Sequence, residues 1–187
     1  TASNYRENYV EVPDNNEPIS VTPLYTDAGF WKVFTFRFLH GKPFTQADID
    51  AKRREVVLPV SVARKLFATD DVVGRRFNMD AQEYRVCGVV EDVSAATPSS
   101  VGDMWLPITL NSWVTSDATG KLVGSVGIYM TAPDTEDKEA LKEEVREVFR
   151  KLNLASDKYM NDLMGQPDDY WASTFRFDSC SAPDLAD

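Results

Sequence analysis

The stretch "EVVLPVSVARKLFATDDVVGRRFNMDAQEYRVCGVVEDV", residues 55–93, specifies several structural elements in close succession and contains no evident catalytic group. The apolar residues between positions 56 and 60 run almost without interruption, which predicts a strand covered on both faces. Ser61 can cap the helix "VARKLF" that follows, and Asp70 and Gly74 then end that helix. "RRFNM" and "EYRVCGVVEDV" flank "DAQ", which predicts a hairpin with its loop at residues 80–82.

The residues before this stretch predict extended segments and short helices. Residues 9–12 and 19–24 have the apolar spacing of two strands. Thr26 can cap a short helix, and the alternating phenylalanines of residues 34–38 then have strand spacing. Thr45 begins "TQAD", which resembles a capping box for another short helix.

The residues after the stretch predict one long helix among strands and loops. The helix runs from Glu136 to about Asn153, with its apolar residues on one stripe. We expect strands in "MWLPITL", "GSVGIYMTA" and "WASTFRF", and a polar loop in "NSWVTSDATGK". Because strands and helices do not alternate regularly, the predicted fold class is α+β.

Composition limits the function classes. The chain has 187 residues, 43% of them hydrophobic, and a net charge of −10. An acidic surface repels phosphate backbones, so we expect no nucleic-acid partner. The sequence contains no run of about 20 apolar residues, so it predicts no membrane span within these residues. We expect the chain to be an excised piece of a longer protein, although composition alone favours a complete cytosolic protein.

Residues with catalytic potential are few. His40 is the only histidine, which excludes a two-histidine metal site, and we interpret it as structural or solvated. Cys87 and Cys180 could form one disulfide, but we interpret Cys87 as a buried free cysteine and Cys180 as an unreactive cysteine near the chain end. We interpret the pairs of neighbouring carboxylates, such as Asp70 with Asp71, as residues of solvated loops. We therefore nominate no catalytic, metal or cofactor-binding residue and expect no cofactor, and the partner-binding residues stay unknown.

Two other residue groups leave alternatives open. The basic residues at positions 52–54 and 75–76 form groups too small for a nucleic-acid footprint. Trp31 and Trp105 lie in apolar contexts and are predicted to be core. Trp113 and Trp171 lie in polar contexts, where they either pack over the core edge or form a contact surface.

Three segments in order carry a family resemblance: "YTDAGFWKVFTFRFLHGKPFTQAD", "REVVLPVSVARKLFATDDVVGRRF" and "YRVCGVVEDV". Together they resemble the MacB-like periplasmic core domain. That domain is the extracytoplasmic part of a class of ABC-transporter permeases that includes lipoprotein-release and FtsX-type proteins. "MWLPI" and residues 124–153 also fit the pattern.

The resemblance implies two subdomains. A porter-like β-α-β module would come from both chain ends, residues 1–38 and 109–187. An inserted mixed α/β subdomain, called Sabre in the family, would occupy residues 39–108. Flanking membrane helices outside this sequence would anchor the domain to the inner membrane, on its periplasmic side.

The resemblance also implies a function and partners. The domain would be non-enzymatic and would couple cytoplasmic ATP hydrolysis to export, lipoprotein release or control of a periplasmic partner. Its partners would be a separate ABC ATPase subunit, a second copy of the permease or a related permease, and a periplasmic adaptor or other periplasmic protein. One alternative is a periplasmic peptide- or lipid-binding module without a transport role, and another is a hydrolase that uses carboxylates and a metal.

Overall fold

The computed structural model describes residues 2–3, 8–12, 15–94, 97, 100–115 and 126–155. The chain divides into two compact units, Thr1–Tyr129 and Met130–Asp187. The elements of the first unit are β1 (Ala2–Ser3), β2 (Asn8–Val12), β3 (Asn15–Val21), β4 (Pro23–Thr26), α1 (Phe30–Val33), β5 (Phe38–Gly41), α2 (Gln46–Asp50), β6 (Glu55–Pro59), α3 (Val60–Phe67), β7 (Arg76–Met79), β8 (Gln82–Val90), β9 (Met104–Pro107), η1 (Ile108–Leu110) and α4 (Ser112–Thr115). The second unit contains α5 (Thr135–Ala155).

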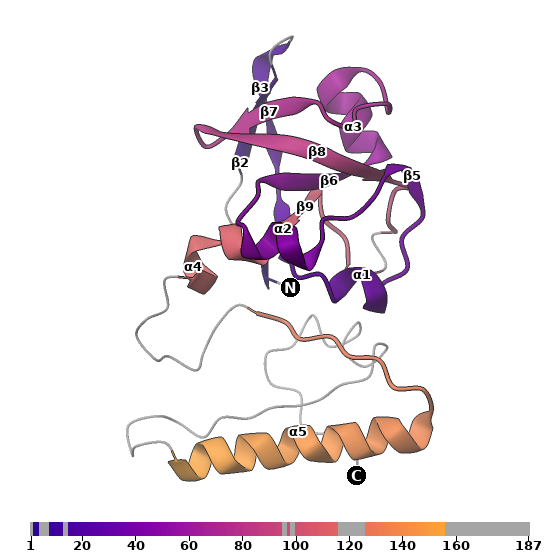
Figure 1. The fold of residues 1–187 in the computed structure, drawn as a ribbon, viewed down its shortest axis with the longest axis vertical. Helices are drawn as coiled ribbons and strands as arrows, with labels where there is room; N and C mark the ends of the chain where they lie inside the picture. Colours follow the sequence, from indigo (N-terminus) through magenta and orange to yellow (C-terminus); the bar gives the residue numbers. More distant parts are fainter. Residues whose placement is uncertain are drawn as a thin grey trace. The chain divides into compact units, whose positions relative to one another are not determined.

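One sheet organises the described part of the first unit (Figure 1). Its strands follow the order β1-β4-β9-β6-β8-β7-β2-β3, and β5 pairs with β8 outside this path. The sheet is mixed, because β6 runs parallel to β8 and antiparallel to β9, whereas β4 runs parallel to β9. Strands from the start of the chain and from its middle are therefore joined by backbone hydrogen bonds.

Strand β6 is buried along its whole length, as its apolar run predicts. Val56 and Leu58 face one apolar core, and Val57 faces a second core on the other side of the sheet. Helix α3 covers the first core with Ala63 and Leu66. Covering both faces explains why the alternation expected of a half-exposed strand is missing here.

Aromatic side chains fill the second core. Trp105, from β9, is completely buried and donates its indole N–H to the carbonyl of Ser100 at 3.1 Å. Trp31 lies 6.1 Å from Trp105 between ring centroids and also contacts Phe36 and Phe44 edge-on. The prediction of a core residue is therefore confirmed for Trp105, whereas Trp31 is partly buried and packs against the core.

Several predictions of local structure are confirmed. The α+β fold class is confirmed, and so is the long helix, which the structure gives as α5. Thr45 caps α2 in a full capping box with Asp48. The predicted hairpin is formed by β7 and β8.

Both predicted helix caps at Thr26 and Ser61 are wrong. Thr26 is buried inside β4, and the amide of Phe30 instead donates to Asp27 Oδ1 at 2.9 Å. Helix α3 begins at Val60, two residues earlier than predicted, so Ser61 lies within the helix. The amide of Ser61 donates to Asp92 Oδ1 at 3.0 Å, so a distant carboxylate takes the role expected of a local hydroxyl.

Four further predictions, of where an element begins or whether it forms, are also wrong. The hairpin turn consists of Asp80 and Ala81, both with positive φ, and Gln82 already belongs to β8. Strand β5 begins only at Phe38, because the preceding phenylalanines pack into the second core instead of pairing. Residues 127–132 form no strand, and the polar loop after Leu110 contains the short helix α4.

Some predictions stay untested. The division into residues 1–38 with 109–187 and residues 39–108 stays a prediction, although strands of both parts share the sheet. The side chain of Trp113 and everything predicted for Trp171, Cys180 and the strand "WASTFRF" lie outside the described residues.

Gly41 offers a test of how closely β5 approaches β8. Its φ is +68°, and an added Cβ would overlap the carbonyl oxygen of Cys87. Gly74 is a matched control, because its φ is +87° but an added Cβ meets nothing within 4 Å. We expect Gly74→Ala to lower the free energy of unfolding by about 1–2 kcal/mol, the cost of left-handed backbone. Gly41→Ala should cost clearly more in the same chemical denaturation experiment, and equal losses would contradict the close approach.

Candidate functional site

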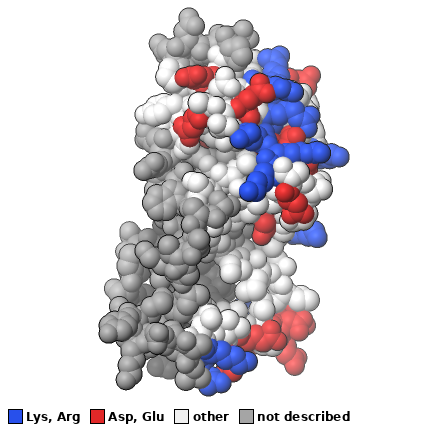
Figure 2. Space-filling view, turned by 60° about the vertical axis from the view of Figure 1, so that its left-hand side comes forward, with Lys and Arg blue, Asp and Glu red and all other residues white. Residues whose placement is uncertain are grey.

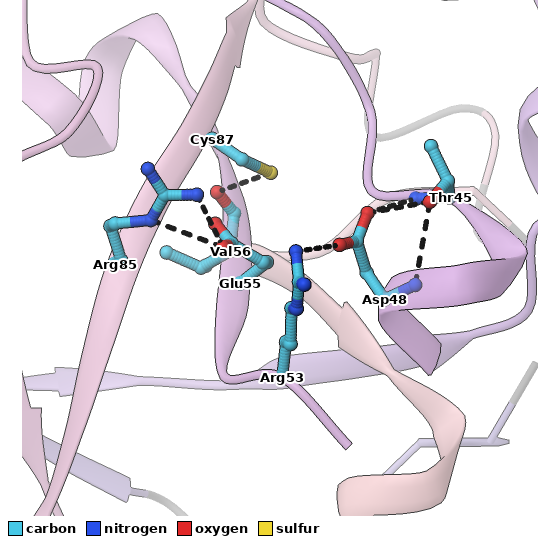
Figure 3. Close-up of polar contacts among 7 residues, drawn as sticks. All are labelled: Thr45, Asp48, Arg53, Glu55, Val56, Arg85 and Cys87. Atoms are coloured by element: carbon cyan, nitrogen blue, oxygen red, sulfur yellow. Dashed lines mark hydrogen bonds and ion pairs between the residues drawn. The ribbon is translucent and has the colours of Figure 1, made fainter. Parts of the chain in front are cut away.

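A buried carboxylate at the start of β6 fixes an arginine on the neighbouring strand (Figure 3). Glu55 and Arg85 are paired residues of β6 and β8, and the Glu55 side chain is only 7% exposed. Arg85 donates Nε at 3.1 Å and Nη2 at 2.5 Å to the same oxygen, Oε1. These bonds raise the pKa of Arg85 and hold a guanidinium whose side chain is still 51% exposed.

A second arginine lies beside Arg85 on the next strand. Arg76 of β7 is the direct partner of Arg85 in the antiparallel ladder, so both side chains leave the sheet on the same face. Arg76 Nη1 donates to Glu83 Oε1 at 2.7 Å. Two like charges directly opposite each other repel, and each arginine has its own carboxylate to offset that repulsion.

A third arginine is fixed from α2. Arg53 Nη1 donates to Asp48 Oδ1 at 3.0 Å, while the other carboxylate oxygen of Asp48 accepts from the hydroxyl of Thr45 (Figure 3). The hydrogen bonds from Thr45, with a smaller contribution from Arg53, lower the pKa of Asp48. The carboxylate therefore stays ionised and holds Arg53 near the start of β6.

Lys52 and Arg54 are also exposed, and neither forms an ion pair with any described residue. The carbonyl of Arg54 accepts from the amide of Arg85 at 2.9 Å, but side chains alternate along a strand, so Arg54 leaves the sheet on the face opposite to Glu55 and Arg85. We call Arg53, Arg76 and Arg85 the basic surface.

The basic surface contrasts with the rest of the chain. Each of its three arginines is paired with one carboxylate, so the surface is locally neutral, whereas the chain as a whole has a net charge of −10. Figure 2 shows basic side chains gathered on one face, with acidic side chains between them and at their margins. The arrangement offers no nucleophile or acid–base pair.

This surface is not evident from the sequence, in which residues 52–54 and 75–76 form separate small groups and Arg85 lies inside a predicted strand. Which residue faces Arg76 depends on the register of the hairpin. The predicted three-residue loop at 80–82 would pair Arg76 with Val86. The actual two-residue turn pairs Arg76 with Arg85.

Among the residues that the structure describes, the other candidates do not come together into a site. His40 Nε2 lies 3.9 Å from Asp70 Oδ1, and Asp70 is also bound by Arg64. Burial raises the pKa of Cys87 to about 12, and its thiol donates to the carbonyl of Val56. Within the described ranges no three potential ligands converge on a point that could hold a metal ion.

A family comparison matches residues 2–148 of the chain to the MacB-like periplasmic core domain. The chain belongs to this family. The expected resemblance is therefore confirmed, and it extends beyond the three segments that first indicated it.

A curated relative of this MacB-like chain is the macrolide export ATP-binding/permease protein MacB of Shigella dysenteriae. The two are 25% identical over 146 residues, which cover 77% of this chain. The match spans 21% of the relative, so this chain corresponds to about a fifth of that protein's length.

Solved structures share the fold. The periplasmic region of MacB from Actinobacillus actinomycetemcomitans has a TM-score of 0.55 at 21% identity, covering 79% of this chain and 65% of that one. The extracellular domain of the ABC-type transporter YknZ from Gram-positive bacteria has a TM-score of 0.57 at 16% identity, covering 86% and 79%. A permease domain from Porphyromonas gingivalis has a TM-score of 0.56 at 19% identity, covering 88% and 76%.

None of the described helices is long and apolar enough to cross a bilayer.

Removing Arg85 should lower the free energy of unfolding more than removing the charge of Glu55. Arg85→Ala leaves a buried carboxylate without its cation, which we expect to lower the free energy of unfolding by about 3 kcal/mol at neutral pH. Glu55→Gln removes the buried charge and leaves a half-exposed arginine that water can solvate, so we expect a loss of about 1 kcal/mol. Urea denaturation of both variants measures the difference, and a larger loss in Glu55→Gln would contradict the anchoring role of Glu55.

Proposed function

We propose that this chain is the extracytoplasmic, non-catalytic domain of an ABC-transporter permease. In that role it couples cytoplasmic ATP hydrolysis to export, lipoprotein release or control of a periplasmic partner. The observation that carries the proposal is the match of residues 2–148 to the MacB-like periplasmic core domain. The curated relative that is named as an ATP-binding/permease protein supports the transport context.

The sheet supports a role in transmitting motion. β4, near the start of the chain, is bonded to β9, then to β6 and to β8, all through backbone hydrogen bonds. Such a ladder moves as a rigid body, because its strands cannot slide without breaking hydrogen bonds. A displacement applied near the chain start would therefore reach the basic surface on β7, β8 and the segment before β6.

The subdomain division is part of the same proposal. Residues 1–38 with 109–187 would form the porter-like part, and residues 39–108 would form the Sabre-like insertion. Because β4 pairs with β9 over four residues, the two parts would share one ladder and move together. The inferred partners are an ABC ATPase subunit, a second or related permease, and a periplasmic protein.

Membrane topology of the full-length protein tests this function. In a background with Cys87→Ala and Cys180→Ser, Lys65→Cys places a thiol on the exposed side of α3. Ala63→Cys is the matched control, because it lies on the same helix and is completely buried. We expect a membrane-impermeant maleimide to label Lys65→Cys in cells with a permeabilised outer membrane, and to leave Ala63→Cys unlabelled until denaturation.

Fractionation completes the topology test. The labelled protein should stay with the inner membrane after a carbonate wash. Labelling of Lys65→Cys only after lysis of the inner membrane, or release of the protein by the wash, would contradict the proposed function.

A further inference from the structure

We propose that residues 130–133 form a hinge between the two units of the chain, with Tyr129 and Asp134 as its fixed ends. The boundary between the units falls at this point, because the first unit ends at Tyr129 and the second begins at Met130. The inference rests on the proposed function only in that the transporter would drive the movement of one unit against the other. It adds to that function the place at which the domain bends.

Tyr129 fixes the first end of the hinge. Its ring packs edge-on against Phe34, with the ring centroids 5.2 Å apart and the ring planes at 70°. The same side chain covers Gly127, where an added Cβ would lie between 3.1 and 3.4 Å from three of its atoms. Val126 and Ile128 are 42% and 80% exposed, so Tyr129 is the side chain of this segment that reaches the core.

Phe34 connects this contact to the centre of the sheet. Its ring centroid lies 4.9 Å from that of Phe30, which is almost completely buried, and Phe30 lies 5.4 Å from Phe36. Phe36 packs edge-on against the buried Trp105 of β9, with the centroids 5.2 Å apart. Because close-packed side chains resist displacement, the chain is held to the core of the first unit as far as Tyr129.

Asp134 fixes the second end, because it caps α5. Its Oδ1 accepts a hydrogen bond from the amide of Asp137 at 2.8 Å, and its carbonyl accepts from the amide of Lys138 at 3.1 Å. The acidic residues of the first turn, Glu136 and Asp137, also stabilise the positive end of the helix dipole. The helix is therefore held in place from its first residue, Thr135.

Residues 130–133 have no comparable restraint. They form neither helix nor strand, and they form no hydrogen bond with the described part of the chain. Met130, Thr131 and Pro133 are exposed. Pro133 has a fixed φ and restricts Ala132 to extended backbone, so Met130 and Thr131 supply most of the freedom to rotate. Hinges in proteins usually consist of a few such residues at the ends of elements.

Residual dipolar couplings of backbone amides, measured by NMR on the purified 187-residue chain, locate the hinge because they average over motions up to milliseconds. We expect the amides of residues 127–129 to fit the alignment of the first unit, and those from Glu136 onward to fit a different alignment. The couplings of Met130 and Thr131 should fit neither. Their reduction should match a fall in order parameter from about 0.85 to below about 0.6, which separates rigid from flexible backbone.

Variants at the two ends test whether Tyr129 and Asp134 set the limits of the hinge. Tyr129→Leu removes the ring but keeps an apolar side chain, so the mobile stretch should extend back to residue 127. Phe34→Leu removes the other ring of the same contact and should have the same effect. Tyr129→Phe is the matched control, because it keeps the ring and should leave the limits unchanged.

The second end has its own matched pair. Asp134→Ala should extend the mobile stretch into the first turn of α5, whereas Asp134→Asn keeps a capping oxygen and should not. The amide spectrum of each variant shows whether the rest of the chain stays folded.

Three results would overturn the inference: a single alignment that fits both units together with residues 130–132, wild-type mobility that already begins at residue 127, or equal effects of Tyr129→Leu and Tyr129→Phe. Because the measurement needs neither a membrane nor an ATPase, any of these results leaves the topology test and the proposed function standing. Conversely, labelling of Lys65→Cys only after lysis of the inner membrane would remove the proposed function and leave the hinge, as a property of the chain, intact.

Discussion

The whole first unit depends on β6 being buried on both faces. Val56 and Leu58 join one core and Val57 the other, so this strand separates the two cores of the described residues. It pairs with β8 along its whole length on one edge, and with β9 at Val57 on the other. A strand that is buried on both faces and paired on both sides fixes the positions of its neighbours, because any shift in register would expose apolar side chains or leave backbone groups unpaired.

The same strand links the core to the basic surface. Glu55 is its first residue, and its buried carboxylate holds Arg85, which in turn lies opposite Arg76. The orientation of the exposed arginines therefore depends on the register of buried strands. This dependence gives a physical route by which a rigid-body movement of the sheet would move the basic surface.

Patterns of neighbouring residues predicted the local elements, and long-range contacts account for the errors. The apolar run of β6, the capping box at Thr45 and the helix α5 follow from short-range rules and are confirmed. The cap of α3 could not be predicted, because its amide partner, Asp92, is distant in sequence. The basic surface was missed for a similar reason, since a single residue in the hairpin loop decides whether Arg76 faces Arg85 or Val86. The family resemblance supplied the class of function, which the residues alone did not.

Hydrogen exchange of backbone amides, measured by NMR on the purified chain, tests most directly whether β6 is the central element. The account predicts that the amides of Val57 and Leu58 are among the slowest to exchange, on the order of a thousandfold slower than those of the edge strand β3 after correction for intrinsic rates. The amides of Trp105 and Val89, in the two adjacent strands, should be protected to a similar extent. Exchange of the β6 amides as fast as those of β3 would contradict the account, because the strand would then open independently of the core that it is said to hold together.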